Sequence, residues 1–207
     1  MALAAASIAF PQLALGAPVR LLAFGDSLIH GYGLPAEQSL PVQLEAALRA
    51  AGEEVVVING GNSGDTTASG LSRLEWTLAG GADAVLLSLG ANDGLRGLDP
   101  AETEKNLRAM LDILAQKRLP VLLAGMYAPR NLGADYAAQF DAIYPALAAD
   151  YGTLFYPFLL QGVALDPTLN QADGIHPNAE GVAIIVQGLL PEAQALVARA
   201  RGAATQG

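Results

Sequence analysis

Short apolar runs alternate along this chain with longer segments whose apolar residues recur at helical spacing, and this alternation constrains the fold more than any other feature. The runs are continuous rather than alternating in polarity, as expected for strands covered on both faces of a parallel sheet. They occupy residues 19–24, 55–58, 84–89, 121–124 and 153–156, and the helical segments occupy residues 40–51, 100–116, 135–150 and 178–199. The pattern predicts an α/β fold with five parallel strands.

Length and composition agree with one folded domain. The chain has 207 residues, of which 52% are hydrophobic and 15% are charged, so it is too apolar to be intrinsically disordered. We expect a single domain over residues 19–199 and a flexible tail at residues 200–207, because no charged linker or composition break divides the chain. The net charge of −9 provides no basic field for phosphate backbones, and nucleic acid is therefore not an expected partner.

The residue types that are present limit the chemistry. The chain contains no cysteine, which excludes disulfides, thiolate zinc sites, iron–sulfur clusters and a cysteine nucleophile. It contains two histidines, His30 and His176, which leave little for a histidine-rich metal site. We expect no metal and no cofactor, since the sequence also lacks a phosphate-binding loop and a dinucleotide fingerprint.

Residues 2–17 form an uncharged, largely apolar stretch. The stretch is shorter than the ~20 residues of a membrane span and ends in small residues like those of a signal cleavage site, although no basic residue precedes Arg20. We expect residues 1–18 to be a signal-peptide remnant or a flexible extension. The first alternative predicts a periplasmic or secreted protein and the second a cytoplasmic one. We expect no stable membrane insertion, and a monomer or small homo-oligomer.

Glycine-rich and polar loops follow the first three predicted strands. Their sequences are GDSLIHGYG, NGGNSGDTT and GANDGLRG, and a fourth stretch of this kind, QADGIHPN, precedes the last predicted helix. Ligands of open parallel sheets bind where loops leave the carboxyl ends of the strands. We therefore expect the functional site to be assembled from these loops.

Ser27 lies just after the first predicted strand. It is a candidate nucleophile or, alternatively, a helix N-cap. A serine hydroxyl needs a base that takes its proton. His30 is too close along the chain to orient well, and we expect it to be a partly exposed residue. His176 is the better candidate, because Gly174 permits a turn that folds Asp173 back onto its Nδ1. Alternatively, Asp173 is a cap and His176 a surface residue; a metal-binding pair is less favoured, because no second ligand cluster accompanies it.

An acyl-transfer site also needs hydrogen-bond donors for the developing oxyanion. The candidates are the backbone N–H of Ser27, the backbone N–H of Gly64 and the side-chain amide of Asn92, which follow the first, second and third strands. Each of these residues also has a simple explanation as a turn former. Three donors at adjacent strand ends favour the oxyanion-hole interpretation.

Four blocks in this order resemble the motifs of the SGNH (GDSL) hydrolase family: residues 25–28, 63–66, 90–93 and 173–178. Residues 94–97 and 142–145 resemble its bacterial arylesterase and multifunctional acyl-CoA thioesterase/lysophospholipase branch, and the likeness covers residues 19–190. The resemblance implies a three-layer α/β/α sandwich of flavodoxin-like type. It also implies that Ser27 is the nucleophile, His176 the base and Asp173 its partner, with Ser27, Gly64 and Asn92 forming the oxyanion hole.

The sequence departs from the branch at Ala91, where a second glycine is usual, and we expect its methyl group to trim the pocket beside Asn92. Ile29 replaces the second glycine of a G-x-S-x-G elbow, which argues against an ordinary α/β-hydrolase.

The expected function is hydrolysis of aryl or short-to-medium acyl esters and of acyl thioesters, both small-molecule substrates. The alternatives are an acyltransferase, or a carbohydrate or lysophospholipid esterase, using the same site. A flavodoxin-like binding domain is a more remote alternative, suggested by the acidic charge and the glycine-rich loops. Six residues are expected to line the substrate pocket: Leu28, Leu95, Met126, Tyr127, Pro129 and Leu132.

Overall fold

A computed structural model describes residues 17–204, and its centre is a parallel sheet of five strands in the order β2-β1-β3-β4-β5. The strands are β1 (Val19–Gly25), β2 (Val55–Gly61), β3 (Ala84–Ser88), β4 (Val121–Ala124) and β5 (Leu154–Tyr156). All four strand pairings are parallel. The five strands predicted from continuous apolar runs are therefore confirmed, with small shifts at their ends.

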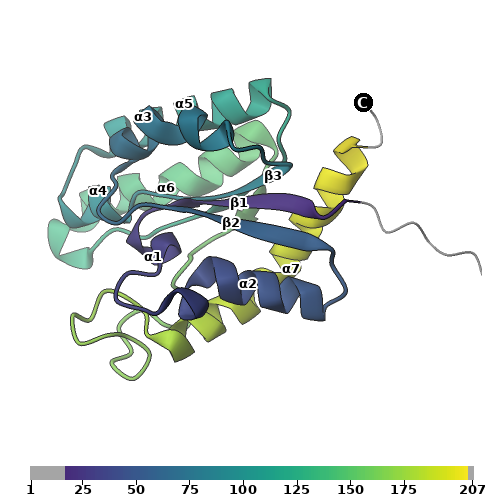
Figure 1. Ribbon diagram of the computed structural model, residues 1–207. Coiled ribbons are helices and arrows are strands. Elements are labelled where there is room, and N and C mark those ends of the chain that lie inside the picture. The colour runs from purple at the N-terminus through teal and green to yellow at the C-terminus, as the bar shows by residue number, and fades with distance from the viewer. Residues whose placement is uncertain (1–16, 205–207) are drawn as a thin grey trace, which may run out of the picture.

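Helices cover both faces of this sheet and make the fold a three-layer α/β/α sandwich (Figure 1). On one face lie α2 (Leu40–Ala50) and α7 (Ala179–Ala204). On the other lie α3 (Thr67–Leu78), α5 (Pro100–Gln116) and α6 (Ala134–Tyr151). Two short helices, α1 (Ser27–His30) and α4 (Ala91–Leu95), lie beyond the carboxyl ends of the strands, at the left of Figure 1.

The strands have continuous apolar sequences because both of their faces are buried. All five residues of β3 are buried, and six of the seven residues of β1 are buried, Arg20 being the exception. Leu22, Phe24, Leu86 and Leu87 are among the largest side chains that are fully enclosed. Burial of an apolar side chain stabilises the fold by roughly 1.5–3 kcal/mol, so the central strands are a main source of stability.

Helix α3 was absent from the sequence-based prediction, which left residues 67–78 as loop. Its sequence, TASGLSRLEWTL, is rich in small polar residues and carries a glycine in its second turn. The structure explains this glycine: a Cβ on Gly70 would stand 2.3 Å from the side chain of Leu89. A residue that weakens helical propensity is therefore required so that the helix can approach the sheet.

Two helix starts lie close to their predicted positions. Helix α5 begins at Pro100, the predicted residue, and its cap is Asp99, which accepts a hydrogen bond from the N–H of Ala101 over 2.9 Å. Helix α7 begins at Ala179, one residue after the predicted start, and the preceding Pro177 forms an isolated bridge with Asn170.

Helix α7 continues to Ala204, past the predicted end at residue 199, so residues 200–204 are helical rather than a flexible tail. By length and composition it could cross a membrane. Its fully buried Leu189, Leu196 and Val197 belong to the hydrophobic core, which accounts for the apolar composition. The export prediction rests on residues 2–17, nearly all outside the described part of the chain, and stays a prediction, as do the domain boundaries and the oligomeric state.

The strand order places a switch in chain direction at the carboxyl ends of β1 and β3. The chain crosses from β1 to β2 on one side, then returns past β1 to β3 and continues to β4 and β5 on the other. Loops after β1 and β3 therefore leave in opposite directions, and such a switch point is where open α/β sheets bind ligands. The loops carrying Ser27 and Asn92 are the two that flank it.

We predict that Leu86→Ala lowers the free energy of unfolding by about 2–5 kcal/mol, because it opens a cavity in the central strand β3 where Leu86 is 0% exposed. The matched variant Leu165→Ala, at a side chain that is 93% exposed, is expected to change stability by less than about 0.5 kcal/mol. Urea denaturation followed by circular dichroism measures both. Equal losses in the two variants would contradict this account of the core.

Candidate active site

Ser27 stands at the carboxyl end of β1, as the first residue of α1. The cap of this helix is Asp26 and not Ser27: Oδ1 of Asp26 accepts a hydrogen bond from the N–H of Leu28 over 3.0 Å. The alternative that Ser27 serves as the N-cap is therefore wrong. The turn is tight, because a Cβ on Gly25 would be 2.4 Å from the carbonyl oxygen of Ser88.

The structure brings together three of the residues singled out from the sequence. Nε2 of His176 is 2.9 Å from Oγ of Ser27, and Nδ1 of His176 is 2.7 Å from Oδ2 of Asp173. His176 is 18% and Asp173 38% exposed in their side chains, so the group is open to solvent on one side. His30, by contrast, is exposed, with Nδ1 3.3 Å from the carbonyl oxygen of Gly61.

The carboxylate of Asp173 is held by its own turn. Its Oδ1 accepts hydrogen bonds from the N–H groups of Ile175, over 2.9 Å, and His176, over 3.0 Å. Together with the imidazole, these donors lower the pKa of Asp173 to about 2, the His176 backbone N–H being the largest cause. Asp173 is therefore ionised at neutral pH and able to hold a proton on Nδ1. Gly174 makes the turn possible with φ of +69°.

Two of the three predicted oxyanion donors lie at the same cavity, and the third does not. Ser27 and Asn92 line the same cavity as His176, and Gly64 is not among its lining residues. Nδ2 of Asn92 donates to the carbonyl oxygen of Asp65 over 2.9 Å, and Oδ2 of Asp26 is 3.5 Å away, at the limit of a hydrogen bond. The two amide hydrogens of Asn92 thus serve two acceptors, and the longer contact, to Asp26, is the weaker of the two.

Gly64 precedes the residue that holds Asn92. Its φ of +86° is a conformation that glycine adopts readily, and a Cβ there would meet nothing within 4 Å. The carbonyl oxygen of Gly64 accepts a hydrogen bond of 3.0 Å from Nη2 of Arg96. The open space beside Gly64 leaves its backbone accessible.

Arg73, on α3, supports the loops and was not anticipated from the sequence. Its guanidinium donates to the carboxylate of Asp65 over 2.5 Å and to the carbonyl oxygens of Gly60 and Gly25 over 2.9 and 2.8 Å. It also lies over the ring of Phe24, 4.1 Å from the centroid. A single arginine between Ser72 and Leu74 gives no sequence signal of such a role.

Asp93, a buried carboxylate like Asp65, links three helices near the candidate site. The carboxylate of Asp93 accepts hydrogen bonds from the N–H of Thr67 over 2.9 Å and from its hydroxyl over 2.5 Å, and a third from the hydroxyl of Thr103 over 3.3 Å. These bonds tie α4, which carries Asn92, to the starts of α3 and α5. The sequence motif marked Asp93 only as part of a turn.

A cavity of about 610 Å³ opens beside Ser27 and His176. Five of the six predicted pocket residues line it: Leu28, Leu95, Met126, Tyr127 and Pro129. Leu132 does not, because its side chain lies outside the cavity, where it would be 3.7 Å from a Cβ on Gly97. Ala91 also lines the cavity, next to Asn92, where its methyl group was expected to trim the pocket.

The connection after β5 supplies further lining beyond the six residues predicted for the pocket. Ala164, Leu165 and Ile175 border the cavity together with Phe158 and Leu160. Leu165 and Ile175 are exposed, so no periodic burial pattern marks them in the sequence.

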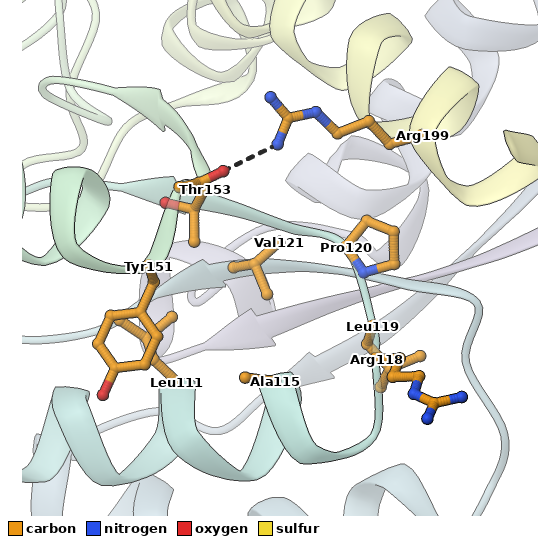
Figure 2. Close-up of a pocket in the computed structure, with 10 residues that line it drawn as sticks. Leu111, Ala115, Arg118, Leu119, Pro120, Val121, Tyr151, Thr153 and Arg199 are labelled. Carbon is orange, nitrogen blue, oxygen red and sulfur yellow. Dashed lines mark hydrogen bonds between the residues drawn. The ribbon is translucent and has the colours of Figure 1, made fainter. Parts of the chain in front are cut away.

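A smaller cavity of about 280 Å³ lies at the amino ends of β4 and β5, next to the end of α5 (Figure 2). Arg199 reaches over it and donates to the carbonyl oxygen of Gly152 over 3.0 Å. None of the predicted site residues borders it. Within residues 17–204, no group of three His, Asp or Glu side chains gathers as a metal site would require.

Comparisons with known proteins show which family this chain belongs to. The GDSL-like Lipase/Acylhydrolase family model matches residues 23–184. An arylesterase of Vibrio mimicus is 42% identical over 78% of this chain and 81% of its own length. Thioesterase 1/protease 1/lysophospholipase L1 of Escherichia coli K12 is 38% identical over 86% of this chain and 84% of its own. The crystal structure of AlinE4, an SGNH-hydrolase family esterase, has a TM-score of 0.75 and 47% identity, covering 84% of this chain and 94% of that one.

Asp26 generates a prediction about pH. Burial raises its pKa from 3.8 to about 6, helped by the nearby Asp65 and Asp93 and opposed by the Leu28 N–H and His176. The folded state therefore binds more protons than the unfolded state between about pH 4 and 6, and stability falls as the pH rises through this window. In Asp26→Asn this loss is absent, so its stability relative to wild type is expected to increase by about 2–3 kcal/mol from pH 4 to pH 7.

Urea denaturation at four pH values within this range measures the difference. The exposed Asp135→Asn gives the baseline for removing one carboxylate from a chain of net charge −9. A difference between Asp26→Asn and wild type that does not vary with pH would show that Asp26 titrates alike in both states.

Proposed function

Because this chain belongs to the GDSL-like lipase/acylhydrolase family, we propose that it hydrolyses carboxylic esters, and acyl thioesters as well, through an acyl intermediate on Ser27. The observation that carries the proposal is the line of contacts from Oγ of Ser27 through both ring nitrogens of His176 to Asp173. The named activities of the similar proteins, arylesterase and thioesterase, support the same chemistry.

The proposed reaction starts with proton transfer. Asp173 keeps the proton of the neutral imidazole on Nδ1, so that Nε2 of His176 accepts the proton of Ser27 as Oγ attacks the acyl carbon. The carbonyl oxygen becomes an oxyanion, for which Ser27 and Gly64 offer backbone N–H groups and Asn92 the amide hydrogen that makes the weak contact with Asp26. His176 then gives its proton to the departing alcohol or thiol.

Deacylation reverses these roles with water. His176 takes a proton from a water molecule, whose oxygen attacks the acyl carbon, and the second tetrahedral intermediate expels Ser27. The Ser27 oxygen recovers its proton from His176, and the product is the free acid. An alcohol in place of water would give transesterification by the same steps, so analysis of products formed with added alcohols distinguishes an acyltransferase from a hydrolase.

The cavity supports acyl or aryl groups as the substrate portion held by the protein. Its lining is largely apolar, and Tyr127 and Phe158 stack with their ring centroids 4.6 Å apart. A site with an apolar body and a few polar groups at one end suits a small ester. The carbohydrate-esterase and flavodoxin-like alternatives find no comparable support in this lining or in the comparisons.

We predict that Ser27→Ala and His176→Ala each lower kcat for an aryl ester by about 10³-fold or more, because each removes a member of one proton-transfer unit. A fluorophosphonate probe is expected to label wild type and to leave Ser27→Ala unlabelled. Ser72→Ala and His30→Ala are the matched controls, since both side chains are exposed and their hydrogen bonds go to the carbonyl oxygens of Ser69 and Gly61 rather than to Ser27 or His176. Full activity in Ser27→Ala would rule out the acyl-serine mechanism.

Ala164→Phe tests the acyl groove, because it places a bulky ring where an exposed alanine lines the cavity. We expect kcat/KM for a long-chain acyl ester to fall about 10-fold or more, while a short aryl ester changes less than about 3-fold. Ala101→Phe, at an exposed alanine on α5, controls for added surface bulk. A panel of esters of increasing chain length measures the effect, and equal changes at every length would place the acyl chain elsewhere.

A further inference from the structure

The segment that carries Asp173 and His176 is a closed loop outside any helix or strand. An isolated antiparallel bridge pairs Asn170 with Pro177, and the N–H of Gln171 donates to the carbonyl oxygen of His176 over 2.7 Å. These bonds give the loop its shape. They do not fix its distance from the nucleophile, which belongs to a different part of the fold.

The side chain of Gln171 makes that connection. Its Nε2 donates to the carbonyl oxygen of Tyr32 over 2.8 Å and to that of Pro177 over 3.0 Å. Tyr32 is in turn tied to the nucleophile helix, because its N–H donates to the carbonyl oxygen of Ser27 over 3.1 Å. The ring of Tyr32 also lies against the imidazole of His176, with centroids 4.6 Å apart. Gln171 therefore joins the loop of the base to the loop of the nucleophile.

Gly33 shows how closely the Gln171 side chain fits against the nucleophile loop. A Cβ on Gly33 would lie 2.1 Å from Oε1 of Gln171, and φ at this glycine is +74°. Only glycine leaves room for the amide at this position. The amide is thus confined by packing on one side and by two accepting carbonyl groups on the other.

We propose that Gln171 is a positioning residue for the proposed hydrolysis, and that its amide holds the imidazole of His176 at reacting distance from Ser27. The inference rests on the proposed function. Contacts run in a closed ring from Ser27 to Tyr32, Gln171 and His176, and return through the 2.9 Å contact between His176 and Ser27. Gln171 acts through His176, and its loss lets the loop shift against the nucleophile.

Gln171→Met tests the proposal, because methionine keeps the length and volume of the side chain and removes the amide donor. We expect kcat for an aryl ester to fall about 10- to 100-fold while KM changes less than about 3-fold, since a misplacement of ~1 Å costs up to about 10²-fold in rate. Fluorophosphonate labelling of Ser27 is expected to slow by a similar factor. A smaller folded fraction would also lower apparent kcat at unchanged KM, but it would not slow the rate constant of labelling. The labelling rate constant is therefore the readout that separates displacement of His176 from loss of folded protein.

Gln43→Met is the matched control. The amide of Gln43 also donates to two carbonyl oxygens, of Gln38 over 2.9 Å and of Ala179 over 3.4 Å. Neither residue belongs to the loop of residues 25–33 that carries Ser27 and Tyr32. Its kcat is expected to stay within about 2-fold of wild type. A wild-type kcat in Gln171→Met, or a loss no larger than in Gln43→Met, overturns the proposal.

A third variant applies if circular dichroism shows that Gln171→Met does not fold. Gln171→Glu keeps the shape, and its ionised carboxylate cannot donate to Tyr32, so the same loss of kcat is expected. Unchanged kcat in that variant overturns the proposal. Wild-type protein that neither turns over esters nor is labelled at Ser27 would instead overturn the proposed function itself, and the role of Gln171 with it.

Discussion

The guanidinium of Arg73 holds together the strand ends on which the candidate site is built. Gly25 is the last residue of β1 and Gly60 the last but one of β2. The carbonyl oxygen of Gly25 also accepts a hydrogen bond from the N–H of Asn62 over 3.0 Å. Arg73 binds the carbonyl oxygens of both glycines, and its charge compensates the buried carboxylate of Asp65. Removing such a charge partner typically costs about 3–5 kcal/mol, because the remaining ion stays buried and unpaired. The loop that carries Ser27 and the loop that carries Gly64 and Asp65 are therefore supported by the same side chain, Arg73.

Three buried carboxylates surround a site proposed to stabilise negative charge, and the protein compensates each differently. Asp65 is paired with Arg73, Asp93 is satisfied by threonine hydroxyl and backbone donors, and Asp26 has a pKa raised by burial to about 6. An ionised Asp26 close to Asn92 disfavours a nearby oxyanion. Because its pKa is about 6, Asp26 is mostly ionised at neutral pH, and its charge opposes the proposed oxyanion-hole role of Asn92.

Much of this arrangement could be predicted from the sequence because it depends on local patterns. Continuous apolar runs located all five strands, and the four polar loops contained Ser27, Asn92, Asp173 and His176. Other features depend on contacts between distant segments: helix α3 was not predicted, and the reason for its Gly70 is the close approach to Leu89. Arg73 and Gln171 are single polar residues with no recurring pattern, so only the folded structure shows which carbonyl groups they meet. Leu132 was misplaced because sequence gives the composition of a loop but not which side chains face inward.

The long connection from β5 to α7 has two tasks at once. Phe158, Leu160 and Leu165 on this connection form one wall of the cavity, and the same stretch ends in the loop that bears the imidazole. The cavity wall and the loop with His176 therefore lie within the same twenty or so residues of chain. Substitutions close together on this connection are the ones whose effects on substrate range and on turnover are expected to be non-additive.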